Sequence, residues 1–330
     1  MFTPSIAAVR QTNASAIASL TSKCKSLPVA IFVGGTSGVG LGTASAFASH
    51  TKGNAHIIIV GRNEPAARSL ISTFPRSPSS EAHHEFISCD VTLMKNVEKT
   101  TTEILSRYPK INYLVMSPGF ITTKGRDESS EGIDRKLAVH YYARWKFVWD
   151  LLPGLTKAKQ EGEEARVLSV LTAGRGTDVQ GYLESEDWGM RKKFSQVAIA
   201  RAGPTYMDLM LEEFSSQNSS IHFIHAHPGW VKTPLLANAD SFFLRASTHL
   251  IFGVLGPWMV SSEEGGEFML KGLLSTPTDS TRAWRVNGYG EDIGKKAYHG
   301  TDEQRKALWQ HTVEEMKRVN VSDHDQSRLT

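Results

Sequence analysis

Short apolar runs alternate with longer amphipathic stretches through the first two thirds of the chain. Residues 29–33 and 55–60 are continuous apolar runs, as strands buried on both faces require, and a stretch of helical periodicity follows each of them. This alternation is typical of a parallel sheet with helices on both faces. We expect Pro153 and Gly154 to end the fourth helix. The predicted strands are 29–33, 55–60, 86–89, 111–116, 166–171 and 221–226, and the predicted helices are 39–50, 64–74, 95–108, 132–152 and 192–214.

The pattern loosens after His227. A broken apolar stretch occupies residues 237–258. It is followed by a predicted helix at 263–274, an edge strand at 284–288 and an amphipathic helix at 304–319. Ligands of open α/β sheets bind outside the carboxyl ends of the strands, so this stretch would form a lid over a bulky apolar substrate. A homo-oligomer contact and core packing are the alternatives. The apolar cap residues are Phe242, Phe243, Leu244, Leu250, Ile251, Phe252, Leu255, Trp258 and Met259.

We expect one domain over 1–330, with an arm at 1–26 and the cap and C-terminal helices at 234–330. The arm contains Arg10, Lys23 and Lys25 and no acidic residue. Such a composition suits a targeting segment, but the basic residues are few, so we favour a helical arm that leads into the first strand.

Composition and charge narrow the classes of partner. Lys and Arg total 37 and Asp and Glu total 34, and the net charge of +3 gives no electrostatic basis for binding nucleic acid. No run of about 18 apolar residues occurs, so no transmembrane helix is expected. Two cysteines, Cys24 and Cys89, form no disulfide framework and fit a reducing compartment, which favours a cytoplasmic location.

The turn after the first strand is rich in glycine. A helix that begins there has unpaired N–H groups and a positive dipole end, which together can hold a phosphate. Gly34 permits a sharp turn, Gly38 lets the backbone approach a diphosphate, and Gly40 lets the helix pack on the strand. Glycine-rich turns also occur without a ligand, but a strand before and a helix after are the context of a dinucleotide site. The predicted contacts are Gly34, Thr36, Ser37, Gly38, Val39 and Gly40.

Two further turns bear on the identity of a dinucleotide. Arg62 follows the second strand, where the adenosine ribose would lie. An arginine there accepts a 2′-phosphate, whereas an acidic residue would hold the 2′-hydroxyl of NAD, so Arg62 predicts NADP. The alternative is a solvated surface arginine. Asp90 follows the third strand and either hydrogen-bonds the adenine or caps the helix that begins near Leu93.

In this order the motifs resemble those of the short-chain dehydrogenases/reductases, over roughly residues 29–233. Cys89-Asp90-Val91 is similar to the adenine-contacting turn of that family, and Met116-Ser117-Pro118-Gly119 stands where Asn-Asn-Ala-Gly is usual. The run His227-Pro228-Gly229-Trp230-Val231-Lys232-Thr233 is similar to the segment that holds the nicotinamide. The sequence segments HYYARWKF and HPGWVKTP are most similar to those of fungal members linked to secondary metabolism. The resemblance implies an α/β fold with a Rossmann-type doubly wound sheet, and it adds Ser117, Gly119, Pro228, Gly229, Val231 and Thr233 to the cofactor site.

The catalytic set of that family is matched only in part. The resemblance places Thr172 at the position of a serine and His140 at that of an asparagine. The best register puts Phe194 and Ala198 where the family carries its Tyr and Lys, and no Tyr-x-x-x-Lys occurs between Thr172 and His225. A positioned general acid–base is worth about 10²–10⁴ in rate, so this loss would be large. His140 is the candidate replacement, and a hydrogen-bonded helix histidine is the alternative.

No metal site is predicted, because His225 and His227 share a strand face without a third ligand. Two functions remain. The first is NADP-dependent reduction of a carbonyl, or the reverse oxidation, on an apolar metabolite, with Thr172 holding the oxygen and His140, the substrate or water supplying the proton. The second is a non-redox protein on the same fold, either a cofactor-binding isomerase or cyclase or a binding protein without chemistry. We favour the oxidoreductase.

Overall fold

The structure is a computed structural model that describes residues 4–319 except 236, 238, 242–244, 247–252, 254–255, 257–258 and 278–281. Of the predicted apolar cap, Met259 is described, and the other eight residues lie outside the described residues. The cap therefore stays a prediction.

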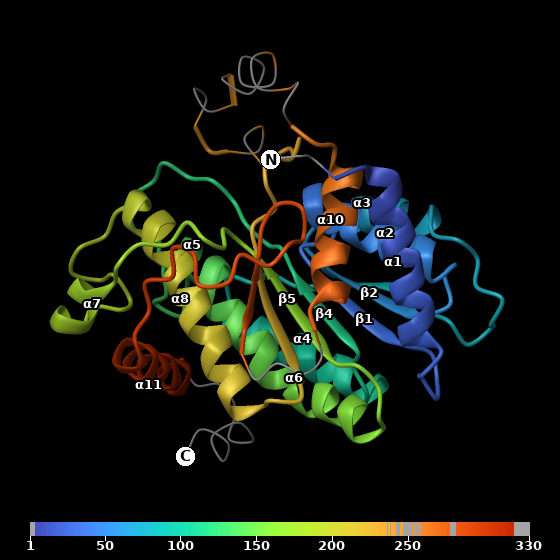
Figure 1. Ribbon diagram of the computed structural model, residues 1–330. Helices are drawn as coiled ribbons and strands as arrows, with labels where there is room; N and C mark the ends of the chain where they lie inside the picture. Colours follow the sequence, from blue (N-terminus) through green and yellow to red (C-terminus); the bar gives the residue numbers. More distant parts are fainter. Residues whose placement is uncertain are drawn as a thin grey trace.

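Seven parallel strands form one sheet in the order β3-β2-β1-β4-β5-β6-β7 (Figure 1). The chain leaves the centre of the sheet first in one direction and then in the other, which confirms the doubly wound arrangement. The order reverses between β1 and β4, and ligands of such folds bind at the carboxyl ends of the strands beside this point. The strands are β1 (Val29–Val33), β2 (His56–Gly61), β3 (His84–Ser88), β4 (Tyr113–Met116), β5 (Arg166–Val170), β6 (His222–Ala226) and β7 (Trp284–Val286).

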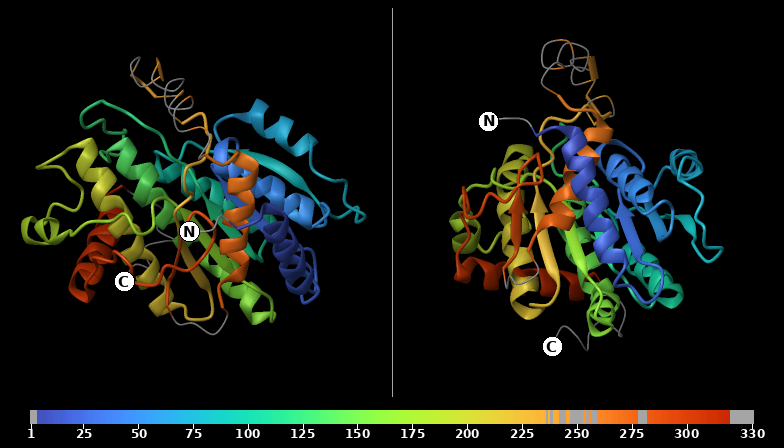
Figure 2. Two further views of the ribbon diagram at one scale, coloured as in Figure 1. Left: turned by 45° about the horizontal axis from the view of Figure 1, so that its top comes forward. Right: turned by 45° about the vertical axis from the view of Figure 1, so that its right-hand side comes forward.

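Helices cover both faces of the sheet (Figure 2). In β1, Val29, Ile31 and Val33 pack into the core under α4, α6 and α8, and Ala30 and Phe32 pack into the core under α1, α2 and α10. This two-sided burial is why the strands appear as continuous apolar runs. The helices are α1 (Ile6–Thr21), α2 (Gly38–His50), α3 (Glu64–Ser72), α4 (Met94–Arg107), α5 (Arg135–Leu137), the π-helical turn η1 (Ala138–Tyr142), α6 (Ala143–Gln160), α7 (Gln180–Ser185), α8 (Gln196–Gln217), α10 (Ser262–Ser275) and α11 (Asp302–Arg318).

The helix predicted at 132–152 is wrong at both ends. Asp134 accepts two backbone N–H groups at the start of α5, and the chain then passes through the π turn η1 into α6, which continues to Gln160. Pro153 lies inside α6 rather than ending it. A proline removes one helical hydrogen bond, but Leu155 and Ala158 beyond it are fully buried, and their burial offsets that loss. The helix predicted from residue 192 likewise begins four residues later, at Gln196.

The predicted N-terminal arm is the helix α1, which packs against α10 and α2. Asn13 is fully buried on its inner face, and its Nδ2 donates to Glu267 Oε2 (2.7 Å) and to Glu267 O (2.9 Å). The same carboxylate lies 3.0 Å from His50 Nε2 on α2 and 3.3 Å from Arg10 Nε. One acidic side chain thus connects three helices.

Asn13→Ala is expected to lower the free energy of unfolding by about 1–3 kcal/mol, because two buried acceptors lose their donor. Urea unfolding followed by circular dichroism measures the change. Thr12→Ala is the matched control, since Thr12 is exposed on the same helix and bonds only to Ala8 O within it. Equal losses in the two variants would contradict the role of the Asn13–Glu267 contact.

Candidate active site

The glycine turn brings three segments into close contact. Gly34 has a φ of +83°, in the left-handed region that favours glycine. A Cβ atom at Gly34 would lie 2.7 Å from Pro118 N, and one at Gly40 would collide with Ser117 Oγ and lie 2.7 Å from Gly34 O. Only glycine therefore lets the end of β1, the start of α2 and the loop after β4 approach this closely.

The N-terminus of α2 carries hydrogen-bond donors that the protein itself does not use. The backbone N–H groups of Gly38, Val39 and Gly40 have no hydrogen-bond partner in the described part of the chain, and the N-cap residue Ser37 makes no side-chain cap bond. Unpaired N–H groups at a helix N-terminus bind phosphate. The residues present therefore fit the diphosphate of a dinucleotide.

The neighbouring turns converge on this helix end. A Cβ at Gly38 would lie 3.0 Å from Thr233 Cγ2, and one at Gly61 would lie 3.3 Å from Thr36 Cγ2. Arg62 follows Gly61 and is exposed. The segment before Thr233 is held by a parallel bridge between Val231 and Val260, after Gly229 at a φ of +74°. The structure thus brings the predicted cofactor contacts of β1, β2, β4 and β6 to one edge of the sheet.

The predicted capping of α4 by Asp90 is wrong: the N-cap residue of this helix, Leu93, has no side-chain cap bond, and Glu131 accepts the N–H groups of Met94 and Lys95. Asp90 Oδ1 instead accepts the Thr92 N–H at 3.1 Å, in the turn before the helix. Its Oδ2 has no partner among the residues that the structure describes, so it stays available to an adenine amino group.

His140 lies in the π turn η1, a feature that often marks functional sites. Its Nε2 would lie 3.7 Å from a Cβ at Gly119, and its ring meets that of Phe120 edge to face at 6.4 Å. Burial, with the nearby charges of Arg144 and Lys136, lowers the pKa of His140 to about 3. The imidazole is therefore neutral at neutral pH, and it can donate or accept a hydrogen bond without carrying charge.

Thr172 follows β5 and is held by a buried polar chain that sequence reasoning missed. Its N–H donates to His225 Nε2 at 3.3 Å, and His225 Nδ1 lies 2.6 Å from Asp208 Oδ1. Asp208 Oδ2 lies 3.1 Å from Arg285 Nη2. Because Nε2 accepts the Thr172 N–H, the bond to Asp208 is donated from His225 Nδ1. The Thr172 hydroxyl has no partner within the described residues, so it is available to a ligand.

Phe194 and Ala198 lie at the start of α8. Phe194 precedes the helix, is half-buried and has the Arg126 guanidinium 5.9 Å from its ring centre. Ala198 N–H donates to the N-cap residue Ser195. Neither side chain supplies a proton or a charge, and their equivalence to the family's Tyr and Lys stays a prediction.

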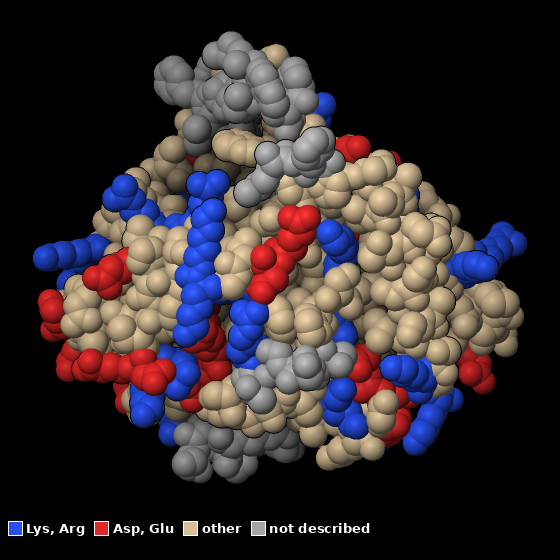
Figure 3. Space-filling view, viewed as in Figure 1, with Lys and Arg blue, Asp and Glu red and all other residues tan. Residues whose placement is uncertain are grey.

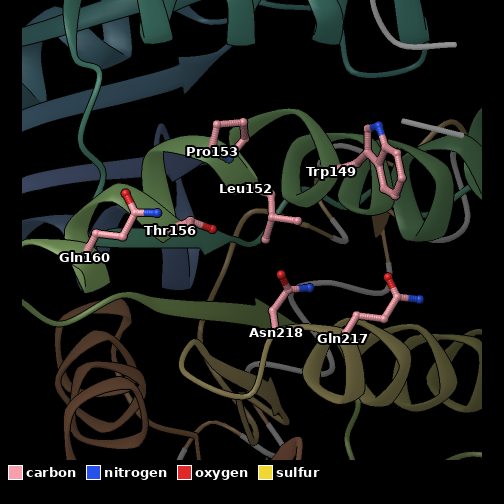
Figure 4. Close-up of a pocket in the computed structure, with 7 residues that line it drawn as sticks. All are labelled: Trp149, Leu152, Pro153, Thr156, Gln160, Gln217 and Asn218. Carbon is pink, nitrogen blue, oxygen red and sulfur yellow. The ribbon is translucent and has the colours of Figure 1, made fainter. Parts of the chain in front are cut away.

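A cavity of about 510 Å³ lies between α6 and α8, away from these residues. Figure 4 shows residues of α6 on one side and the end of α8 on the other. The end of α8 leads directly into β6, so the cavity lies near the amino ends of the strands, opposite the candidate site. It is lined by Trp149, Leu152, Pro153, Thr156, Gln160, Gln217 and Asn218.

Charged side chains of the described residues do not gather by sign on the face that Figure 3 shows. Acidic and basic side chains are interspersed over the face in Figure 3, in keeping with the net charge of +3. Within the described ranges, no helix combines the length and the apolar character that crossing a membrane requires.

Comparisons with known proteins identify the family. A sequence model of the short chain dehydrogenases matches residues 28–183. Oxidoreductase AN1596 of Emericella nidulans is 34% identical over 74% of this chain and 71% of that protein, and oxidoreductase andH of Emericella variicolor is 31% identical over 80% and 73%. NADPH-bound carbonyl reductase from chicken fatty liver shares the fold, with a TM-score of 0.55 and 18% identity over 82% of this chain and 100% of that one. The chain belongs to the short-chain dehydrogenase/reductase family and is an oxidoreductase of that type, built on a fold that binds a nicotinamide coenzyme.

Proposed function

We propose that the protein uses NADPH to reduce a carbonyl group of a bulky apolar small molecule, or catalyses the reverse oxidation. The observation that carries this proposal is the set of unpaired N–H groups at the start of α2, and Arg62 follows Gly61, which approaches Thr36 of the same turn. A guanidinium at this turn would favour the 2′-phosphate of NADP. The resemblance of the sequence motifs to fungal members supports a place in secondary metabolism.

The chemistry is a two-electron reduction. A reduced nicotinamide coenzyme held at the N-terminus of α2 would supply the hydride for the carbonyl carbon; the C=O π pair would then move to the oxygen, and the oxygen would take up a proton. The free hydroxyl of Thr172 would hold that oxygen, and neutral His140 would donate a second hydrogen bond from its N–H. With a pKa of about 3, His140 is not protonated at neutral pH, so the sequence-based expectation that it donates the proton is not supported, and the proton would come from the substrate or from water.

Exposed apolar side chains support an apolar substrate. The large hydrophobic residues that are exposed in the described part of the chain are Val197, Trp230 and Leu235, and Trp230 is 65% exposed. Trp230 and Leu235 follow β6, and Val197 lies in the first turn of α8. All three belong to segments that follow the carboxyl ends of strands, where substrates of this fold bind.

Arg62→Leu is expected to weaken NADPH binding about 10- to 100-fold and to leave NADH binding almost unchanged. A hydrogen bond to a charged group is worth about 1.5–3 kcal/mol, and each 1.4 kcal/mol is tenfold in affinity. Fluorescence titration with each coenzyme measures both constants. Arg68→Leu is the control, since Arg68 is exposed on α3 and pairs with Glu64.

Turnover is tested by the loss of NADPH absorbance with a panel of apolar aldehydes and ketones. No binding of either coenzyme to the folded protein would refute the proposal. The non-redox alternative, which rests on Phe194 and Ala198, is not favoured by the oxidoreductase relatives. Three results together would favour the non-redox alternative: tight NADPH binding, no carbonyl reduction by the native chain, and a gain of activity in Phe194→Tyr/Ala198→Lys.

A further inference from the structure

Arg144 is a buried cation where three segments of the candidate site meet. It lies in the first turn of α6, and its side chain is 1% exposed. Its guanidinium donates to the end of β4 and the loop that follows, to the end of β5, and to the π turn η1. The bonds run from Nη1 to Met116 O (3.2 Å), Ser169 Oγ (2.7 Å) and Val170 O (2.9 Å), from Nη2 to Pro118 O (2.7 Å) and from Nε to Val139 O (3.2 Å).

The carbonyls of Pro118, Val170 and Val139 lie close in sequence to predicted site residues. They are one or two residues from Gly119, Thr172 and His140, respectively. The position of Arg144 therefore fixes the spacing among three segments that come from different parts of the chain. Errors of about 1 Å in such spacing can cost about 10² in rate.

Among the residues that the structure describes, the positive charge of Arg144 has no counter-ion. All five acceptors are neutral, and Arg144 forms no ion pair with any described residue. Burial lowers its pKa to about 9, so it remains protonated at neutral pH. A buried charge is costly unless dipoles or an anion stabilise it. Here carbonyl dipoles stabilise the Arg144 guanidinium beneath the carboxyl ends of the strands. No anion among the described residues lies close enough to cancel its electric field.

We propose that Arg144 is a positioning residue of this site. Its guanidinium holds the three segments in one arrangement and places a positive charge beneath the sheet edge, where the substrate oxygen becomes negative during carbonyl reduction. Preorganised positive charge stabilises such an oxygen without reorganisation at the moment of reaction. The part that concerns the substrate rests on the proposed function, whereas the effect of the charge on His140 does not.

The test compares Arg144→Lys, which keeps the charge, with Arg144→Met, which removes it. NMR of ¹⁵N-labelled histidine follows the titration of His140, which faces Arg144 of α6, Lys136 of α5 and the ring of Phe120. In wild type, we expect no titration through the ordinary histidine range of about pH 6.5. Arg144→Met should raise the pKa of His140 by about one pH unit, and Arg144→Lys should leave it low. With an apolar ketone, kcat should fall about 10²-fold in Arg144→Met and be partly restored by lysine.

Arg166→Met is the control, because Arg166 is equally buried but lies at the amino end of β5, far along the strand from Val170. It should lose stability without changing the His140 titration. A His140 that titrates near pH 6.5 in wild type, or identically in the lysine and methionine variants, would overturn the proposal. If Arg144→Met does not fold, titration of the wild-type His140 near pH 6.5 would still overturn the proposal, and Arg144→Lys would still have to keep the pKa of His140 low. Absence of carbonyl reduction together with the expected NMR result would instead refute the proposed function and, with it, the substrate part of this inference.

Discussion

Gly40→Ala is expected to weaken NADPH binding at least about tenfold. The new Cβ would collide with Ser117 Oγ and lie 2.7 Å from Gly34 O, and backbone cannot move away as a flexible side chain would. Overpacking of this kind costs about 1–3 kcal/mol, and the strain falls on the turn that presents the N–H donors of α2. Fluorescence titration with NADPH measures the affinity, and thermal unfolding shows whether the variant is folded.

Two further variants separate the local collision from a general effect of alanine. Gly125→Ala is the control, since a Cβ there meets nothing within 4 Å, and it should bind NADPH as the wild type does. Ser117→Ala in the Gly40→Ala background should recover part of the affinity, because it removes one of the two collisions. Wild-type affinity in Gly40→Ala would mean that the close approach of α2 to the loop after β4 is not needed for binding.

The sheet could be predicted from sequence because its strands are buried on both faces. Continuous apolar runs identified β1 at its observed limits and β2 to within one residue. The six-residue α7 was not predicted, since it has no buried residue and hence no apolar pattern. The π turn was missed because four of its five residues are buried, which removes the periodicity that would reveal a change of helix type. Pro153 indicated a helix end that does not exist, because a proline's effect depends on the packing beyond it.

The candidate site, like the fold, could be predicted from the sequence only in part. The glycine contacts are local in sequence, so their spacing alone could indicate a dinucleotide site. The roles of Arg144, His225 and Asp208 depend on partners that only the packing of helices on the sheet brings together. One signal was present: Arg144 lies in a largely apolar and aromatic stretch, and a charge that is buried there requires several hydrogen-bond acceptors or an ion-pair partner. The strand pattern around His225 showed two histidines on one face without a third metal ligand, and it could not reveal Asp208 because that residue lies on a different element.

Asp208→Ala is expected to cause the largest loss of stability, about 3–5 kcal/mol. Asp208 and Arg285 are each 3% exposed, so the variant leaves a buried guanidinium without its carboxylate and His225 Nδ1 without its acceptor. Total stabilities of about 5–15 kcal/mol make this a large fraction. Urea unfolding measures it through a lower midpoint at constant m-value. Asp292→Ala breaks an exposed Asp–Arg pair and should cost only about 0–1 kcal/mol, so similar losses would contradict the prediction.

Asp208→Asn extends the test to Thr172. The amide preserves shape but can donate to His225 Nδ1, which would move the histidine proton to Nε2, opposite the Thr172 N–H. Two donors would then face each other, and the Thr172 amide should lose its hydrogen bond. The expected signs are an upfield shift of the Thr172 amide proton and its faster hydrogen exchange, with NADPH affinity unchanged. A Thr172 amide unaffected by Asp208→Asn would show that Asp208 stabilises the fold without controlling the position of Thr172.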